Sequence, residues 1–66
     1  MTKKELMDTR EILFNEDFSI KTDNIEDVKE FCSYLTSITG VQCCTYFGYT
    51  NELLPSIYES VLNISK

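Results

Sequence analysis

The chain has 66 residues, with 6 basic and 11 acidic side chains, a formal net charge of −5 and no histidine. This length leaves room for one small domain, residues 1–66, whose own core is expected to supply no more than about 3–5 kcal/mol of stability. Without histidine the chain lacks the usual proton-transferring side chain and the commonest metal ligand. We therefore expect no enzyme, no catalytic residues, no metal site and no cofactor. The absence of a basic cluster also argues against direct binding to nucleic acid.

The first predicted element is a short helix from about residue 3 to residue 13. Residues 2–5 (TKKE) have the spacing of a capping box, in which the Thr and Glu side chains bind backbone N–H groups at a helix start. The apolar positions of this segment are few, and Arg10 lies near the same stripe. An alternative stays open, in which residues 11–14 and 18–22 form a hairpin around the intervening turn.

A strand and then a helix are predicted in the middle of the chain. Residues 17–22 alternate between apolar or β-branched and polar side chains, which is typical of a half-buried strand. Residues 22–24 (TDN) then offer N-cap side chains, and Asp23 and Glu26 have capping-box spacing. Gly40 is a typical residue at which a helix ends. The apolar residues at helical spacing between these signals are Ile25, Val28, Phe31, Cys32, Leu35 and Ile38.

The last third of the chain predicts a second strand and a final helix. Residues 41–47 alternate, which points Val41, Cys43, Thr45 and Phe47 toward the helices. Residues 48–51 have turn chemistry, and Pro55 fits the first turn of the helix that follows. The apolar positions of that helix are Leu53, Leu54, Ile57, Tyr58, Val61, Leu62 and Ile64.

These elements predict an α+β fold, with a small sheet of two or three strands packed by two to three helices. Two strands joined by a helix make too small a sheet to be stable alone. The third strand would come from the hairpin alternative or from a second copy of the chain across a two-fold axis. We therefore expect a homodimer in which the second copy completes the sheet or the core.

The three cysteines are interpreted as structural thiols in a cytoplasmic chain. Their number is odd, Cys43 and Cys44 are adjacent, and nothing in the sequence resembles a secretory signal. Opposite faces of the predicted strand would separate Cys43 from Cys44, and Cys44 is the thiol to test for reactivity. The uncharged stretch 31–51 contains several polar residues, so we expect no membrane segment.

One candidate binding surface is an acidic row on the central helix, opposite its apolar stripe. Residues three or four positions apart are neighbours on a helix surface. The row could contact a basic groove of a partner, with a tyrosine as aromatic anchor. The simpler interpretation is a solvated face whose first-turn acids interact with the helix dipole. The row consists of Asp23, Asp27, Glu30 and Tyr34.

A second candidate surface is the aromatic turn at residues 46–49 (YFGY). Strand alternation cannot bury all of its rings, and tyrosine is enriched at binding interfaces. The alternative buries Phe47 and leaves Tyr46 and Tyr49 to cover the sheet and the next helix. Both tyrosines are therefore candidate contact residues.

Together, these features predict a small acidic binding protein without enzymatic activity. It would inhibit or modulate a larger protein partner, through the acidic row or through Tyr46 and Tyr49. The lack of alanine suggests a low-GC genome, such as that of a phage, virus or mobile element. One alternative is a homodimeric small-ligand binder or sponge with a pocket between protomers near Cys44, Tyr46 and Tyr49. Another is a purely structural subunit.

Overall fold

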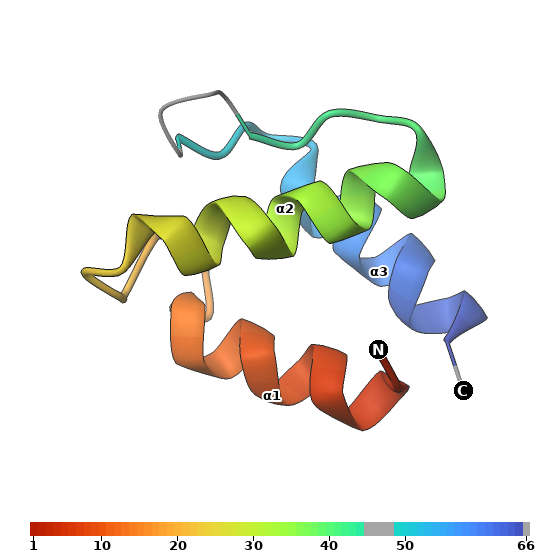
Figure 1. The fold of residues 1–66 in the computed structure, drawn as a ribbon, viewed down its shortest axis with the longest axis horizontal. Coiled ribbons are helices and arrows are strands. Elements are labelled where there is room, and N and C mark those ends of the chain that lie inside the picture. Colours follow the sequence, from red (N-terminus) through yellow and green to blue (C-terminus); the bar gives the residue numbers. More distant parts are fainter. Residues whose placement is uncertain (45–48, 66) are drawn as a thin grey trace.

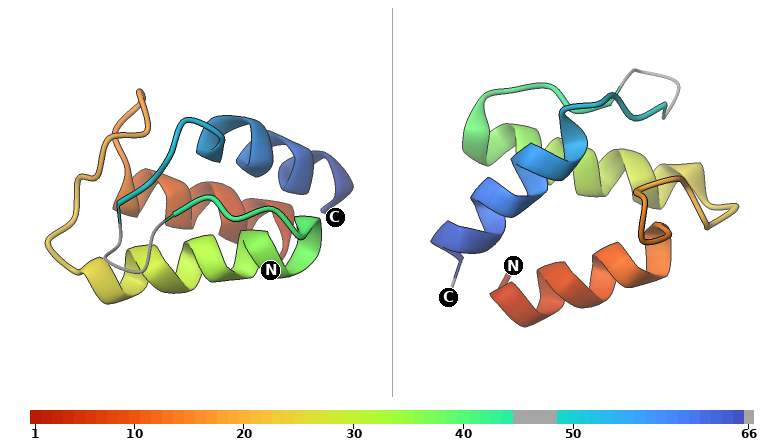
Figure 2. Two further views of the ribbon diagram at one scale, coloured as in Figure 1. Left: turned by 90° about the horizontal axis from the view of Figure 1, so that it is seen from above. Right: turned by 180° about the vertical axis from the view of Figure 1, so that it is seen from behind.

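The fold of the computed structural model consists of three helices within the described residues, which are 1–44 and 49–65. The helices are α1 (Lys3–Leu13), α2 (Ile25–Thr39) and α3 (Leu54–Ile64). Each of them packs against the other two. Figure 1 shows α2 crossing the molecule above α1, with the described parts of the segment between α2 and α3 on the side of α2 away from α1. Figure 2 shows the same arrangement from above and from behind.

The predicted α+β fold is wrong, because the described residues form no strand and no sheet. Only two isolated antiparallel bridges occur there, Phe14 with Ile20 and Cys44 with Thr50. Residues 17–22 form a turn and irregular backbone, and residues 41–44 of the second predicted strand are irregular apart from the bridge at Cys44. Residues 45–47 of that strand lie outside the described residues. Since no sheet needs completing in the described chain, that reason for expecting a homodimer is removed.

The alternation that suggested a strand at residues 17–22 has another physical cause. Phe18 and Ile20 pack against the helical core, while Ser19 and Lys21 are exposed. The backbone here bonds within its own turn, where the Asn15 N–H donates to the Ser19 carbonyl at 2.9 Å. The alternating side chains therefore cover the helices without a neighbouring strand.

Helix α1 has the predicted bounds and the predicted capping box. The Thr2 hydroxyl accepts from the Glu5 N–H at 3.2 Å, and the Glu5 carboxylate accepts from the Thr2 N–H at 3.4 Å. The hairpin alternative is wrong for residues 11–13, which are helical. The chain nevertheless reverses direction after α1, because the Lys21 N–H donates to the Leu13 carbonyl at 2.9 Å.

The ends of α2 and α3 follow the local signals in the sequence. Asn24 is the N-cap of α2, and its side chain accepts from the Asp27 N–H at 3.4 Å. A capping box from Asp23 is therefore ruled out, because the helix begins one residue later than that spacing required. Gly40 ends α2 with a backbone φ of 74°, as predicted. Pro55 lies in the first turn of α3, which also confirms the prediction.

The core lies where the three helices meet and is closed by residues flanking them. Several predicted apolar positions are instead exposed, among them Ile38, Val41 and Ile64. Among the described residues no polar or charged residue is buried. None of the helices in the described chain is both long and apolar enough to cross a membrane. The buried residues are Leu6, Leu13, Phe14, Val28, Phe31, Cys32, Leu35, Cys43, Leu54, Ile57 and Val61.

Candidate functional site

Two residues of the predicted acidic row line a hollow of about 360 Å³ between α1 and α2. We call it the α1–α2 hollow. Its floor contains the buried Leu13 and Phe31, and Asp27 and Glu30 are exposed on its α2 side. Ile12 lies on the α1 side and is 66% exposed. Met1 and Thr9 complete the lining. The hollow thus joins an apolar floor to two carboxylates.

The other two residues of the acidic row have different surroundings. Asp23 is exposed just before the N-cap of α2 and does not line the hollow. Tyr34 is partly buried against the core, and its hydroxyl accepts a hydrogen bond from the Met1 ammonium at 2.9 Å. The structure therefore brings Asp27 and Glu30 together at one hollow, with Asp23 before the N-cap of α2 and Tyr34 further along the helix.

No lysine lines the α1–α2 hollow in the described chain, and the positive group on a lining residue is the Met1 ammonium, which donates to the Tyr34 hydroxyl. Lys29 forms an ion pair with Glu26 at 3.6 Å. Lys29 is two residues after Asp27 and so points to a different side of α2, because successive helical residues are rotated by about 100°. Lys21 lines a neighbouring hollow of about 660 Å³, which also includes Ile12. The acidic side of the α1–α2 hollow therefore suits a positively charged group.

The predicted aromatic turn is only partly described. Tyr46 lies outside the described residues, so its predicted role stays untested. Tyr49 is 71% exposed in the segment between α2 and α3. That segment touches α2 near Cys32 and Thr36, where Cys43 makes its contacts. These positions lie on another side of α2 from Asp27.

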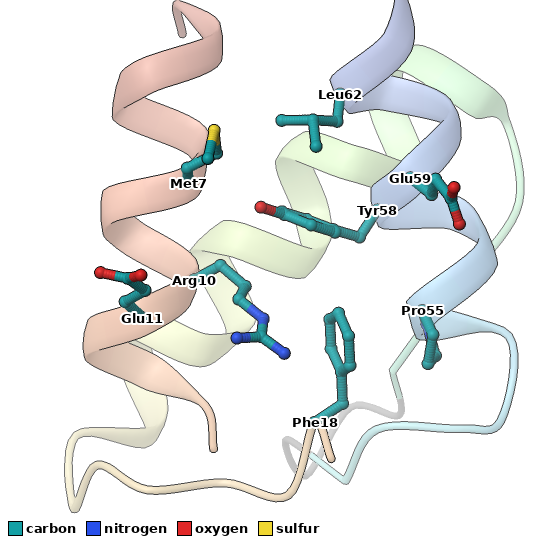
Figure 3. Close-up of a pocket in the computed structure, with 8 residues that line it drawn as sticks. All are labelled: Met7, Arg10, Glu11, Phe18, Pro55, Tyr58, Glu59 and Leu62. Atoms are coloured by element: carbon teal, nitrogen blue, oxygen red, sulfur yellow. The ribbon is translucent and has the colours of Figure 1, made fainter. Parts of the chain in front are cut away.

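A second concave site lies between α1 and α3, where a groove of about 380 Å³ opens (Figure 3). The Arg10 guanidinium points toward the Phe18 ring and lies 4.3 Å from its centroid. One Nη of Arg10 donates to the Glu16 carbonyl at 2.9 Å, while Nε is buried without a partner among the described atoms. Phe18 also meets Tyr58 edge-on, with ring centroids 5.5 Å apart. This groove is not predicted by the sequence, where its one signal is the cation Arg10 near an apolar stripe.

The surroundings of Tyr58 in this groove shift the pKa of its hydroxyl. Burial raises the pKa of the Tyr58 hydroxyl above its usual value of 10.0; the Arg10 charge opposes the shift and Glu11 adds to it. The Glu11 and Glu59 side chains point away from the rings in Figure 3. The Arg10 hydrogen bond thus joins α1 to the turn after it, and the contact between Phe18 and Tyr58 joins that turn to α3.

The α1–α2 hollow is the stronger candidate for a contact with another molecule, because it combines exposed apolar surface with two carboxylates. Within the described part of the chain, no three His, Cys, Asp or Glu side chains are grouped to hold a metal ion. Comparison of the chain with protein-family models, with curated proteins and with solved structures finds no match.

Proposed function

We propose that this chain is a non-enzymatic binding protein that inhibits or modulates a larger protein partner. The α1–α2 hollow would take a basic, amphipathic segment of that partner. The observation that carries the proposal is the position of Asp27 and Glu30, beside an apolar floor and opposite the exposed Ile12. An acidic face whose only role is contact with water would not require an apolar surface beside it.

The apolar part of the hollow would supply much of the binding free energy. Covering apolar surface is favourable by about 25 cal/mol per Å². An aliphatic side chain of the partner, placed beside Ile12, would remove surface of both residues from water. Contacts of this kind at the centre of an interface carry most of its affinity.

The two carboxylates would orient the bound segment and make the hollow selective for basic partners. An exposed ion pair contributes about 0.2–1 kcal/mol, and more where neighbouring contacts exclude water. The net charge of −5 also speeds the encounter with a basic partner. A partner segment with basic residues on either side of an apolar one therefore fits the hollow best.

We infer that the chain performs this function in the cytoplasm. All three cysteines are free thiols in the structure. Free thiols are typical of proteins that work in a reducing compartment. The partner would then also be cytoplasmic.

Selection from a random displayed peptide library against the folded chain tests the proposal. We expect enriched peptides to carry basic residues around an apolar residue. Titration of one such peptide should shift the backbone NMR signals of residues 9–13 and 27–31. Raising the salt concentration should weaken binding, because screening shortens the range of exposed charges to about 10 Å at 0.1 M.

A charge-matched pair of variants separates the site from the overall charge. Asp27→Asn with Glu30→Gln should lower the affinity for the peptide about tenfold, which corresponds to 1.4 kcal/mol. Glu16→Gln with Glu52→Gln removes the same charge at exposed positions outside the hollow and should change the affinity little. Equal loss in both double variants, or enriched peptides without basic residues, would overturn the proposal.

A further inference from the structure

Arg10 is the only arginine of the chain and lies in the groove between α1 and α3, which we call the α1–α3 groove. One Nη donates to the Glu16 carbonyl at 2.9 Å, and the guanidinium forms no other hydrogen bond with the described residues. Its Nε is buried and has no acceptor among them. A buried N–H group without an acceptor is unfavourable, and native structures usually provide one. Arg10 therefore has unused N–H groups that a bound molecule can accept from.

No carboxylate of the described chain is paired with Arg10. Glu11 and Glu59 line the same groove, but neither forms an ion pair with the guanidinium. In Figure 3 both side chains point away from the aromatic rings, Glu11 from α1 and Glu59 from α3. A guanidinium keeps its charge at every ordinary pH. The middle of the groove thus holds a cation without a counter-ion.

The walls beside Arg10 are apolar and aromatic. The guanidinium carbon lies 4.3 Å from the centroid of the Phe18 ring, and Tyr58 meets Phe18 edge-on. Leu62 continues this wall along α3, and Met7 faces it from α1 (Figure 3). Phe18, Tyr58 and Leu62 are only partly buried, so each keeps surface that a ligand can cover. Apolar walls around a few polar groups are typical of small-molecule sites.

We propose that the α1–α3 groove binds a small monocarboxylate that carries one ring. The carboxylate accepts from the N–H groups of Arg10 that Glu16 leaves unused, since a guanidinium and a carboxylate match in geometry and charge. The ring packs against Phe18, Tyr58 and Leu62. The groove has a volume of about 380 Å³. Ligand pockets span about 300–1,000 Å³, so this one suits a molecule with a single ring.

The two glutamates limit the charge of the ligand. One negative charge is neutralised by Arg10, and any further negative charge meets Glu11 and Glu59 without a cation to balance it. Like charges brought together in this way repel each other. Dicarboxylates and phosphate monoesters should therefore bind more weakly than a monocarboxylate of the same size.

Titration of the wild-type chain with phenylacetate, followed by proton–nitrogen NMR, tests the proposal. Because Arg10 is the only arginine, its Nε–H gives a single side-chain signal of this kind. We expect that signal to move with saturation, at a dissociation constant of about 1 mM or below. The backbone signals of Met7, Tyr58 and Leu62 should move with it. Those of residues 27–31, in the α1–α2 hollow, should not.

Three analogues of phenylacetate separate the contributions of charge and ring without changing the protein. Acetate lacks the ring, phenylacetamide lacks the charge, and phenethylamine reverses it. Each should bind at least about tenfold more weakly than phenylacetate, because each loses either the ring contacts or the charged hydrogen bonds. Tighter binding of phenethylamine would show that Glu11 and Glu59 govern the groove, and would overturn the proposal.

A charge-matched pair of variants assigns the binding to Arg10. Arg10→Gln should weaken phenylacetate binding at least about tenfold. Lys21→Gln removes the same charge at an exposed position outside the groove and should change the affinity little. Arg10→Lys keeps the charge but loses the paired donors, so it should also bind more weakly than the wild type. Circular dichroism checks that each variant is folded, and the three analogues test the wild type even where a variant is not.

Three further results would overturn the proposal. The first is a wild type that shows no saturable binding of phenylacetate at millimolar concentrations. The second is binding that leaves the Arg10 Nε–H signal unmoved. The third is an equal loss of affinity in Arg10→Gln and Lys21→Gln. Asp27→Asn with Glu30→Gln should bind phenylacetate like the wild type, so this test is independent of the α1–α2 hollow.

Discussion

Phe18 combines an unfavourable backbone conformation with favourable side-chain contacts. Its φ of 65° is positive, a region that costs about 1–2 kcal/mol for a residue with a Cβ. Its ring packs against Phe14, against Tyr58 and under the Arg10 guanidinium. Aromatic pairs contribute about 0.5–1.5 kcal/mol each beyond the area they bury. The contacts therefore offset the backbone cost and hold the turn after α1 in place.

Two substitutions at Phe18 separate these effects. Phe18→Ala removes the ring and keeps the backbone cost, so we expect a loss of about 2–4 kcal/mol in the free energy of unfolding. Phe18→Gly removes the ring but relieves the backbone, and should be about 1 kcal/mol more stable than Phe18→Ala. Urea denaturation of both variants measures the difference. A glycine variant less stable than the alanine variant would contradict a strained φ at this position.

At the scale of the elements, the helices could be predicted because their signals are local. The capping box at Thr2, the N-cap at Asn24 and the glycine at Gly40 each act within one turn of the chain. Strands depend on backbone partners far along the sequence, and alternation alone does not provide them. Phe18 and Ile20 alternate with polar residues because they cover helices, and the same pattern misled the strand prediction.

In the candidate site, too, only the residues with local sequence signals could be predicted. Asp27 and Glu30 could be placed on one face of α2 from helical spacing alone. Ile12 could not be assigned to the same site, because the packing of α1 on α2 depends on contacts between residues distant in sequence. The position of Arg10 near an apolar stripe also had no explanation in the sequence. In the structure, its guanidinium lies over the Phe18 ring.

Gly40 provides a test of the end of α2. Its φ of 74° is left-handed, and a Cβ built there would have no heavy atom of the described residues within 4 Å, its chain neighbours aside. Gly40→Ala should therefore cost about 1 kcal/mol through backbone strain alone. Gly40→Asn should cost less, because asparagine tolerates this conformation. Thermal unfolding measures both, and a loss well above 2 kcal/mol for alanine would point to a steric clash instead.

At the scale of the whole molecule, the titratable groups that the core perturbs are thiols and a phenol. Burial raises the pKa values of Cys32 and Cys43 above their usual 9.0, and that of Tyr58 above 10.0. Each group stays protonated in the folded chain at a pH where the unfolded chain already loses the proton. The stability that these groups contribute is therefore complete below pH 9.0 and is lost as the pH rises.

Alkaline titration of stability tests this dependence, in the presence of a reducing agent. We expect the urea midpoint to stay level from about pH 7 to 8.5 and then to fall, with a limiting slope of about 1.4 kcal/mol per pH unit for each perturbed group. In the double variant Cys32→Ala with Cys43→Ala, the urea midpoint should fall less between pH 9.0 and 10.0 than in the wild type. This difference in slope does not depend on how stable the variant is at neutral pH. Tyr58→Phe should leave that part unchanged and reduce only the loss above pH 10.0. A double cysteine variant with the wild-type slope would show that the buried thiols do not govern alkaline unfolding.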